Sequence, residues 1–379
     1  MDFSSLRAHA RANLAAGTLP GCAWLVAVDG EIAERGEEGY LDYEPRTPLP
    51  GNAVFRLASM TKPLTGAAVL SLCEEGKLSL DDPVSRYLPA FAHMGVGRIE
   101  GEAVVFDHEA VRPITIRHLL SHTSGLASGP LGDRQYGAVR PREGQALADC
   151  APRYASLLLD FDPETKNAYS GHVAFDLLGY LCELADGRDF AEIVRRRVTD
   201  PLETDELTYL PTPEMDARTI RLYAETPRGL TRFHRAEGMN FSGYPRTFFG
   251  GSCAMVGTLD AYFHFAQCLL DGGRTRSGAR ILREESVREM TTPAFGGVPT
   301  ASAPGEAWGL SMRVITAERN ACGLPRGTFG WSGAYGTHFF LIPSRRVCAV
   351  YMMNCATAHG AGAPTAREFE RDVTAALGL

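Results

Sequence analysis

The chain has 379 residues, of which 45% are hydrophobic and 22% charged, a composition typical of an ordinary globular protein. Its net charge of −7, without a run of like charges, argues against a nucleic-acid partner and weakly against an anionic membrane. No apolar segment approaches the roughly 18 residues needed to cross a bilayer, so no membrane partner is expected.

The N-terminal segment and the cysteines predict a cytoplasmic protein. Residues 1–21 lack the basic and apolar regions of a secretory signal, and their Leu and Ala spacing favours an amphipathic surface helix. The nine cysteines form no Cys-x-x-Cys pair, and an odd number without a framework is typical of a reducing compartment. A cytoplasmic location is therefore expected, unless a leader has been removed from the sequence.

The first third of the chain predicts a hairpin followed by a long helix. Residues 22–28 have the pattern of a buried strand, and Asp29 with Gly30 forms a turn that leads back through residues 32–39. Residues 57–75 carry apolar side chains at helical spacing and end before a glycine, which predicts a helix.

The middle of the chain predicts helices joined by long loops. Residues 114–120 and 173–184 have helical apolar faces. Residues 95–113 and 125–145 are rich in Gly and Pro, so irregular surface loops are expected there.

The last third returns to strands. Residues 259–270 predict a helix. Apolar or alternating patterns then predict strands at 308–315, 328–332, 337–342 and 347–353, and a closing amphipathic helix at 363–377.

Strands at both ends with helices between them predict an α/β (α+β) fold. Its antiparallel sheet would be built from both chain ends and flanked by helices, with a mostly helical lobe inserted. Residues 1–77 and 256–379 would form the α/β lobe, and residues 78–255 the helical lobe. A site in the cleft between the two lobes is expected.

Residues 59–62, Ser-Met-Thr-Lys, are a candidate nucleophile and base. A serine hydroxyl is a poor nucleophile until a base takes its proton. Residues three apart on a helix share a face, so Lys62 can reach Ser59, and a nearby helix N-terminus favours developing negative charge. The pattern alone is equally typical of a helix cap followed by a surface lysine. Of the three lysines in the chain, however, only Lys62 has a serine three positions earlier.

Two later segments could complete such a site. Tyr169 precedes a predicted helix, where its hydroxyl could project into a cleft, although an ordinary half-buried tyrosine gives the same pattern. Residues 329–337, Phe-Gly-Trp-Ser-Gly-Ala-Tyr-Gly-Thr, predict a strand and a glycine-flanked turn. Such a turn can bring backbone N–H groups close to a ligand, or be a plain β-hairpin.

Together, and in this chain order, the three segments resemble the serine β-lactamase and penicillin-binding-protein superfamily, and its class C branch most. Residues 59–62 match the Ser-x-x-Lys box of that superfamily. Tyr169 and Ser170 match its Tyr-x-Asn element, and Trp331, Ser332 and Gly333 match its Lys/His-Thr-Gly element. Residues 55–63, 116–126 and 250–270 extend the resemblance over most of the chain. It implies a β-lactamase-like fold.

Two departures from the class C pattern bear on the substrate. Gly171 stands where the family has an Asn that helps to bind the amide of a β-lactam. Trp331 stands where the family has a Lys or His that helps to bind the carboxylate of penicillins and cell-wall peptides. A Trp-x-Gly at this place is the pattern of family VIII carboxylesterases and related acyltransferases. The resemblance therefore implies ester chemistry rather than antibiotic hydrolysis.

The resemblance also implies a mechanism. Ser59 attacks an acyl carbonyl, Lys62 and Tyr169 share the role of base, and the backbone N–H groups of Ser59 and Ala334 hold the oxyanion. Which base holds the proton at rest stays open. Water, an alcohol or an amine then takes the acyl group. The candidate substrate wall comprises Tyr136, Tyr244, Trp308, Trp331, Ser332, Gly333 and His338.

Two enzyme functions stay open at this point. The first is a carboxylesterase, and the second is a transacylase that moves an acyl group to an amine or alcohol in a biosynthetic route. A β-lactamase or D-amino-acid peptidase fits less well. A non-catalytic binding protein is disfavoured because Ser59, Lys62 and Tyr169 are all present.

The expected partners are a small ester and an amine or alcohol acceptor, without a cofactor or metal. No His, Cys, Asp and Glu cluster has metal-ligand spacing, and the glycine motifs lack the strand–loop–helix context of a phosphate site. His118 and His122 are assigned to structure.

Overall fold

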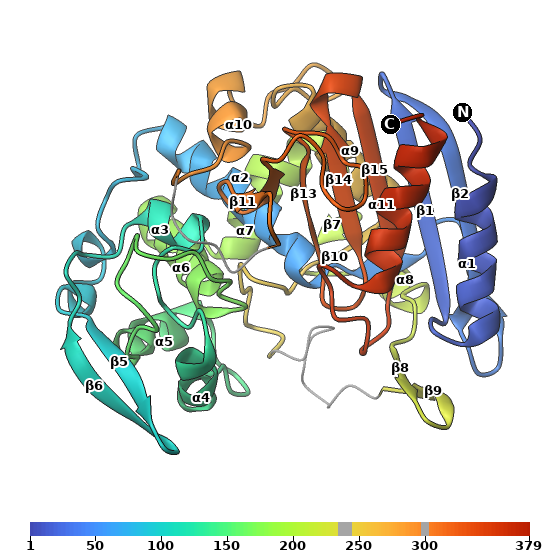
Figure 1. Cartoon of the computed structure of the whole chain (residues 1–379). Coiled ribbons are helices and arrows are strands. Elements are labelled where there is room, and N and C mark those ends of the chain that lie inside the picture. The colour runs from blue at the N-terminus through green and yellow to red at the C-terminus, as the bar shows by residue number, and fades with distance from the viewer. Residues whose placement is uncertain (234–244, 297–302) are drawn as a thin grey trace.

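A computed structural model describes residues 1–233, 245–296 and 303–379 of the chain. Its centre is an eight-stranded antiparallel sheet in the order β11-β12-β13-β14-β15-β1-β2-β3 (Figure 1). The strands are β1 (Gly21–Val28), β2 (Glu31–Asp42), β3 (Thr47–Pro48), β11 (Glu306–Trp308), β12 (Arg313–Ile315), β13 (Phe329–Ser332), β14 (His338–Ile342) and β15 (Val347–Met353). The two chain ends meet where β1 pairs with β15, which confirms the predicted sheet.

Helices cover both faces of the sheet (Figure 1). They are α1 (Ser4–Ala16) and α11 (Pro364–Ala376) on one face, and α2 (Thr61–Glu74) and α9 (Leu259–Leu270) on the other. Successive side chains of a strand point to opposite faces. Trp24 therefore packs in the α1–α11 layer, whereas Leu25 packs in the α2–α9 layer. Two covered faces explain why residues 22–28 are apolar without alternation.

The other described residues form a lobe beside the sheet and three small accessory sheets. The helices are α3 (Ile116–Leu120), α4 (Pro130–Val139), α5 (Leu147–Cys150), α6 (Val173–Asp186), α7 (Phe190–Val194), α8 (Pro213–Ala217) and α10 (Glu284–Met290). The strands are β4 (Val54–Arg56), β5 (Gly95–Glu100), β6 (Ala103–Glu109), β7 (Leu207–Thr208), β8 (Tyr223–Thr226), β9 (Gly229–Arg232) and β10 (Val256–Thr258). Strands β4, β10 and β7 pair in that order, and β5–β6 and β8–β9 are hairpins.

Three local predictions are wrong. Residues 95–109, expected as a loop, form the β5–β6 hairpin around Gly101, whose φ of 57° suits its tight turn. Helix α4 lies inside the other expected loop, where the carboxylate of Asp160 accepts the backbone N–H groups of Leu131 and Gly132 in its first turn. The strand expected at 308–315 is two strands, because the chain turns between them at Ser311, with φ of 71°.

Candidate active site

Ser59 lies in a short 3₁₀ turn, Ala58–Met60, that leads directly into α2. Contacts from the last strands fix the chain just before it. The Asn354 side chain accepts the backbone N–H of Arg56 at 2.9 Å and donates to its carbonyl at 3.1 Å. The Thr337 hydroxyl donates to the carbonyl of Leu57 at 3.0 Å. The position of Ser59 is therefore set by the sheet as well as by its own helix.

Lys62 lies one helical turn further on and is fully buried. Its Nζ atom lies within hydrogen-bond distance of three oxygen atoms: Oγ of Ser59 at 3.2 Å, the carbonyl of Gly171 at 2.7 Å and the carbonyl of Ser252 at 3.0 Å. The two carbonyls can only accept protons from Nζ, whereas the Ser59 hydroxyl can donate to it or accept from it. The arrangement holds the lysine nitrogen against the serine oxygen.

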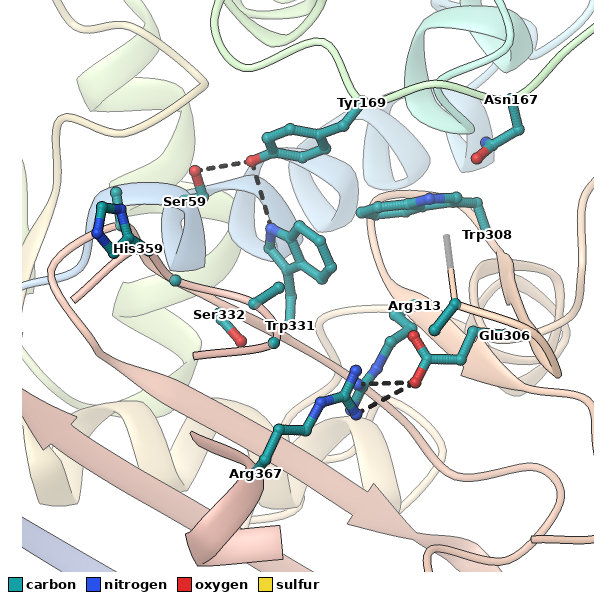
Figure 2. Close-up of a pocket in the computed structure, with 15 residues that line it drawn as sticks. Ser59, Asn167, Tyr169, Glu306, Trp308, Arg313, Trp331, Ser332, His359 and Arg367 are labelled. Carbon is teal, nitrogen blue, oxygen red and sulfur yellow. Dashed lines mark hydrogen bonds and ion pairs between the residues drawn. The ribbon is translucent and has the colours of Figure 1, made fainter. Parts of the chain in front are cut away.

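Tyr169 reaches Ser59 from the lobe, in the segment before α6. Its hydroxyl lies 2.8 Å from Oγ of Ser59, and the indole N–H of Trp331 donates to the same phenol oxygen at 3.4 Å (Figure 2). The Tyr169 ring packs against Trp308, with centroids 5.7 Å apart, and against His122, with centroids 4.6 Å apart. This packing fixes the direction in which the hydroxyl points.

Buried titratable groups lie behind Lys62. Burial raises the pKa of Asp176 to about 7, although hydrogen bonds from Ser252 and the nearby Lys62 oppose the shift. Burial and, secondarily, the charge of Lys62 lower the pKa of His172 to about 4 and that of His122 well below its usual value. The Ser252 peptide links two of these groups, because its carbonyl accepts from Lys62 and its N–H donates to Asp176.

Asp176→Asn should remove a pH dependence of stability. The native carboxyl, with pKa about 7, binds more protons than the unfolded one, whose pKa is near 3.8, so the unfolding free energy falls as pH rises between these values. Asn keeps an acceptor for the Ser252 N–H but does not titrate. From about pH 4 to about pH 7, the unfolding free energy of the variant minus that of the wild type should therefore rise by on the order of 4 kcal/mol. Urea denaturation across this range measures the difference, and parallel pH profiles would contradict the expectation.

The turn after β13 brings Ala334 to the pocket that Ser59 lines. The N–H of Gly333 donates to the carbonyl of Thr337 at 2.7 Å, and that of Gly336 to the carbonyl of Gly333 at 2.9 Å. A Cβ atom on Gly333 would lie 2.2 Å from the carbonyl oxygen of Leu57. Only glycine permits this close approach, which places the turn directly against the segment that carries Ser59.

These residues open on a pocket of about 450 Å³. Figure 2 shows Ser59, Tyr169, Trp331 and Trp308 along one side of it, with Glu306, Arg313 and Arg367 across from them. The complete described lining is Ser59, Asn167, Tyr169, Ala303, Glu306, Trp308, Arg313, Trp331, Ser332, Ala334, His359, Gly360, Ala361, Gly362 and Arg367. The pocket thus has an aromatic wall beside Ser59 and a charged wall opposite.

The positive and negative charges of the charged wall balance each other. Arg313 lies 3.2 Å from Glu306 and 2.5 Å from Glu370, and Arg367 lies 3.2 Å from Glu306 and 3.0 Å from Glu370. Glu370 is completely buried, and Glu306 and Arg313 are less than a tenth exposed. Two buried carboxylates face two guanidinium groups, so the wall is polar without a large net charge.

Three members of the expected substrate wall lie outside the pocket lining, and a fourth is not described. The expectation for His338 is wrong: it is 1% exposed and lies behind Ser332, because β14 is an interior strand covered by α11. Tyr136 stacks on His172, with centroids 5.1 Å apart, outside the described lining. Gly333 supports the turn rather than the wall. Tyr244 lies outside the described residues. Trp308, Trp331, Ser332 and Ala334 line the pocket.

Sequence reasoning missed the charged wall and His359. The signal for Glu370 was present, since it follows Ala366 by four positions and therefore shares the buried stripe of α11. A carboxylate on a buried stripe requires cationic partners, but the sequence did not indicate which. Arg313 lies in the predicted strand 308–315, whose pattern indicates ordinary core packing. Glu306 lies just before that strand, and His359 lies in a loop without a pattern.

An antiparallel sheet, a serine at the start of a buried helix and a lysine and tyrosine in contact with its oxygen define a β-lactamase-like protein. The chain belongs to the Beta-lactamase family, whose family model matches residues 6–371. It is 31% identical to Protein Rv1367c of Mycobacterium tuberculosis over 93% of this chain and 90% of that protein. It is also 28% identical to Esterase EstB of Burkholderia gladioli, over 89% and 86% of the two chains.

Solved structures agree on the fold. EstCE1, described as a hydrolase with promiscuous acyltransferase activity, superposes with a TM-score of 0.82 at 24% identity, over 97% of each chain. A mutant of simvastatin synthase from Aspergillus terreus superposes with a TM-score of 0.78 at 21% identity, over both entire chains. Identities this low support the shared fold alone. Among the described residues, no helix has the length and apolar character needed to cross a membrane.

Proposed function

We propose that this protein is a serine carboxylesterase that acts through an acyl-enzyme on Ser59. The observation that carries the proposal is the position of the Ser59 oxygen, which lies within hydrogen-bond reach of both Lys62 and Tyr169 at the wall of a pocket. A nucleophile in contact with its base is the arrangement that acyl transfer requires. The esterase named among the relatives, and the acyltransferase activity named for a structural neighbour, support the same chemistry.

In the proposed reaction, Tyr169 and Lys62 take the Ser59 proton as Oγ bonds to the acyl carbon. The N–H groups of Ser59 and Ala334 stabilise the oxyanion. Collapse of the tetrahedral intermediate breaks the bond to the leaving alkoxide, which takes a proton from Tyr169. Water then repeats the sequence in reverse and frees the acid. An amine or alcohol in place of water would give transfer.

Product analysis separates hydrolysis from transfer. The enzyme would be given p-nitrophenyl butyrate with and without added amines or alcohols, and the products identified by mass spectrometry. Free butyrate as the main product at every acceptor concentration would support the esterase. Amide or ester formation that dominates at millimolar acceptor would support the transacylase instead. If neither hydrolysis nor transfer is observed, both functions are contradicted.

Short neutral esters should be turned over much faster than cephalosporins. Trp331 provides an indole where a cation would pair with a carboxylate, and a charge-assisted hydrogen bond contributes roughly 1.5–3 kcal/mol, about ten- to a hundredfold. Arg313 and Arg367 also line the pocket but are engaged by Glu306 and Glu370. The measurement compares kcat/KM for p-nitrophenyl butyrate and for a chromogenic cephalosporin.

Trp331→Lys provides the second arm of this comparison. The ammonium group should shift the ratio of kcat/KM values towards the anionic cephalosporin. Because the variant also loses the indole N–H that contacts Tyr169, only the ratio is informative, not the absolute rate. A wild type that favours the cephalosporin, or a ratio that does not change in the variant, would contradict the role assigned to Trp331.

A further inference from the structure

A chain of polar contacts runs from the pocket wall into the sheet. Ser332 on β13 and His338 on β14 are direct partners in the register of the two strands. Oγ of Ser332 lies 2.7 Å from Nδ1 of His338, and Nε2 of the same ring lies 3.2 Å from Oε1 of Glu370 on α11. Ser332 is 4% exposed and lines the pocket, whereas His338 and Glu370 are at most 1% exposed and do not line it. The contacts therefore link a wall hydroxyl to an interior carboxylate.

The location of the protons follows from the charges. Burial alone would raise the pKa of Glu370, but the contacts with His338, Arg313 and Arg367 outweigh it and hold this pKa well below its usual range. An ionised carboxylate has no proton to donate. The contact of Nε2 with Oε1 of Glu370 does not have hydrogen-bond geometry, but a lone pair on Nε2 would face an ionised carboxylate 3.2 Å away and be repelled by it, so the proton of the ring is favoured on Nε2.

The second ring nitrogen is left as an acceptor. Burial lowers the pKa of His338, and the nearby Glu370 offsets only part of this effect, so the ring is neutral. With the proton on Nε2, Nδ1 carries a lone pair and accepts the hydroxyl proton of Ser332. The single O–H donor of Ser332 is thereby occupied inside the wall. What it can then offer to a molecule in the pocket is its two acceptor lone pairs.

We propose that Ser332, held by His338 and Glu370, selects molecules that present a neutral O–H or N–H donor to this wall and disfavours those that present a carboxylate there. A donor meets an available lone pair, whereas a carboxylate meets another acceptor and lacks a partner. An unsatisfied buried polar group is costly. Ser332 is thus a specificity-determining residue of the pocket that contains Ser59, and its role in turnover rests on the proposed function.

The two arginines do not reverse this preference. Each contacts both Glu306 and Glu370 within 3.2 Å, so a carboxylate that approached them would have to compete with two carboxylates already in place. Glu306 itself lines the pocket and would repel such a group. The balanced wall and the occupied Ser332 hydroxyl favour the same neutral donor.

Substituted boronic acids test the preference, because a boronic acid forms a reversible bond from boron to the oxygen of a nucleophilic serine. The probes are the 2-, 3- and 4-isomers of (hydroxymethyl)phenylboronic acid and of carboxyphenylboronic acid, so that at least one position reaches the wall. In the wild type, the inhibition constant of the best hydroxymethyl isomer should be at least about tenfold lower than that of the matching carboxy isomer.

Ser332→Ala should bring this ratio to within about threefold of unity, because the acceptor lone pairs are lost. The exposed Ser156 provides a matched control, and Ser156→Ala should keep the wild-type ratio. A variant that is merely distorted would weaken both inhibitors together and leave the ratio unchanged. His338→Phe should move the ratio towards the carboxy isomer, because it releases the Ser332 hydroxyl to donate.

The result that would overturn the inference is an equal ratio in wild type and Ser332→Ala, or a wild type that prefers the carboxylate. Unsubstituted phenylboronic acid separates this outcome from failure of the proposed function, since its inhibition depends on Ser59 alone. If it does not inhibit, the proposed function fails. The selectivity is then measured by calorimetry with benzyl alcohol and benzoate, for which the same ratio and the same loss in Ser332→Ala are expected.

Discussion

Ser59→Ala should lower kcat for p-nitrophenyl butyrate by at least about a thousandfold, the largest effect expected of any single change in this protein. The variant loses the oxygen that both Lys62 and Tyr169 contact, so no acyl-enzyme can form. Because the Ser59 side chain is small and only half-buried, its removal should leave the fold intact. A comparison of kcat with that of Ser156→Ala, at an exposed serine, measures the loss.

Covalent labelling gives the same prediction an independent readout. A serine-directed fluorophosphonate should add once to the wild type, and peptide mapping should place the adduct on Ser59. The bond forms between the serine oxygen and phosphorus, fluoride leaves, and the proton passes to the Tyr169 and Lys62 pair. An adduct at another serine, together with activity that survives in Ser59→Ala, would remove Ser59 from the mechanism.

Lys62→Ala and Tyr169→Phe should each lower kcat by about three orders of magnitude, and the double variant by little more than either single one. The reason is geometric: both groups contact the same oxygen, the lysine at 3.2 Å and the tyrosine at 2.8 Å. If the two act as one base, the loss of either partner leaves the other without a function. Measured kcat values for the wild type and three variants form a complete double-mutant cycle.

The controls for this cycle are a lysine and a tyrosine away from the pocket. Lys166→Ala removes an exposed lysine, and Tyr180→Phe removes a hydroxyl from the half-buried face of α6. Both should retain near-wild-type kcat. If the losses of Lys62→Ala and Tyr169→Phe simply add in the double variant, the two residues act independently and the shared-base mechanism is wrong.

The sequence by itself determined the sheet and its covering helices. Residues 347–353 and 259–270 were predicted with the bounds that β15 and α9 have, because their apolar patterns match the periods of a strand and a helix. Strands that are apolar on both faces required cover on both sides, and helices from both chain ends provide it. Such local patterns record burial directly, since every residue of the element contributes to them.

Only the tertiary structure decided which polar side chains face the pocket. Arg313 on β12 and Glu370 on α11 are 57 positions apart, yet they form an ion pair behind Ser332. His338, aromatic and beside a glycine turn, resembled a wall residue in the sequence but is buried by α11. Helix α4 likewise begins where Asp160, from a distant loop, accepts its first N–H groups. Periodicity reports whether a position is buried. It does not report the partner, because charges pair across elements that the fold alone brings together.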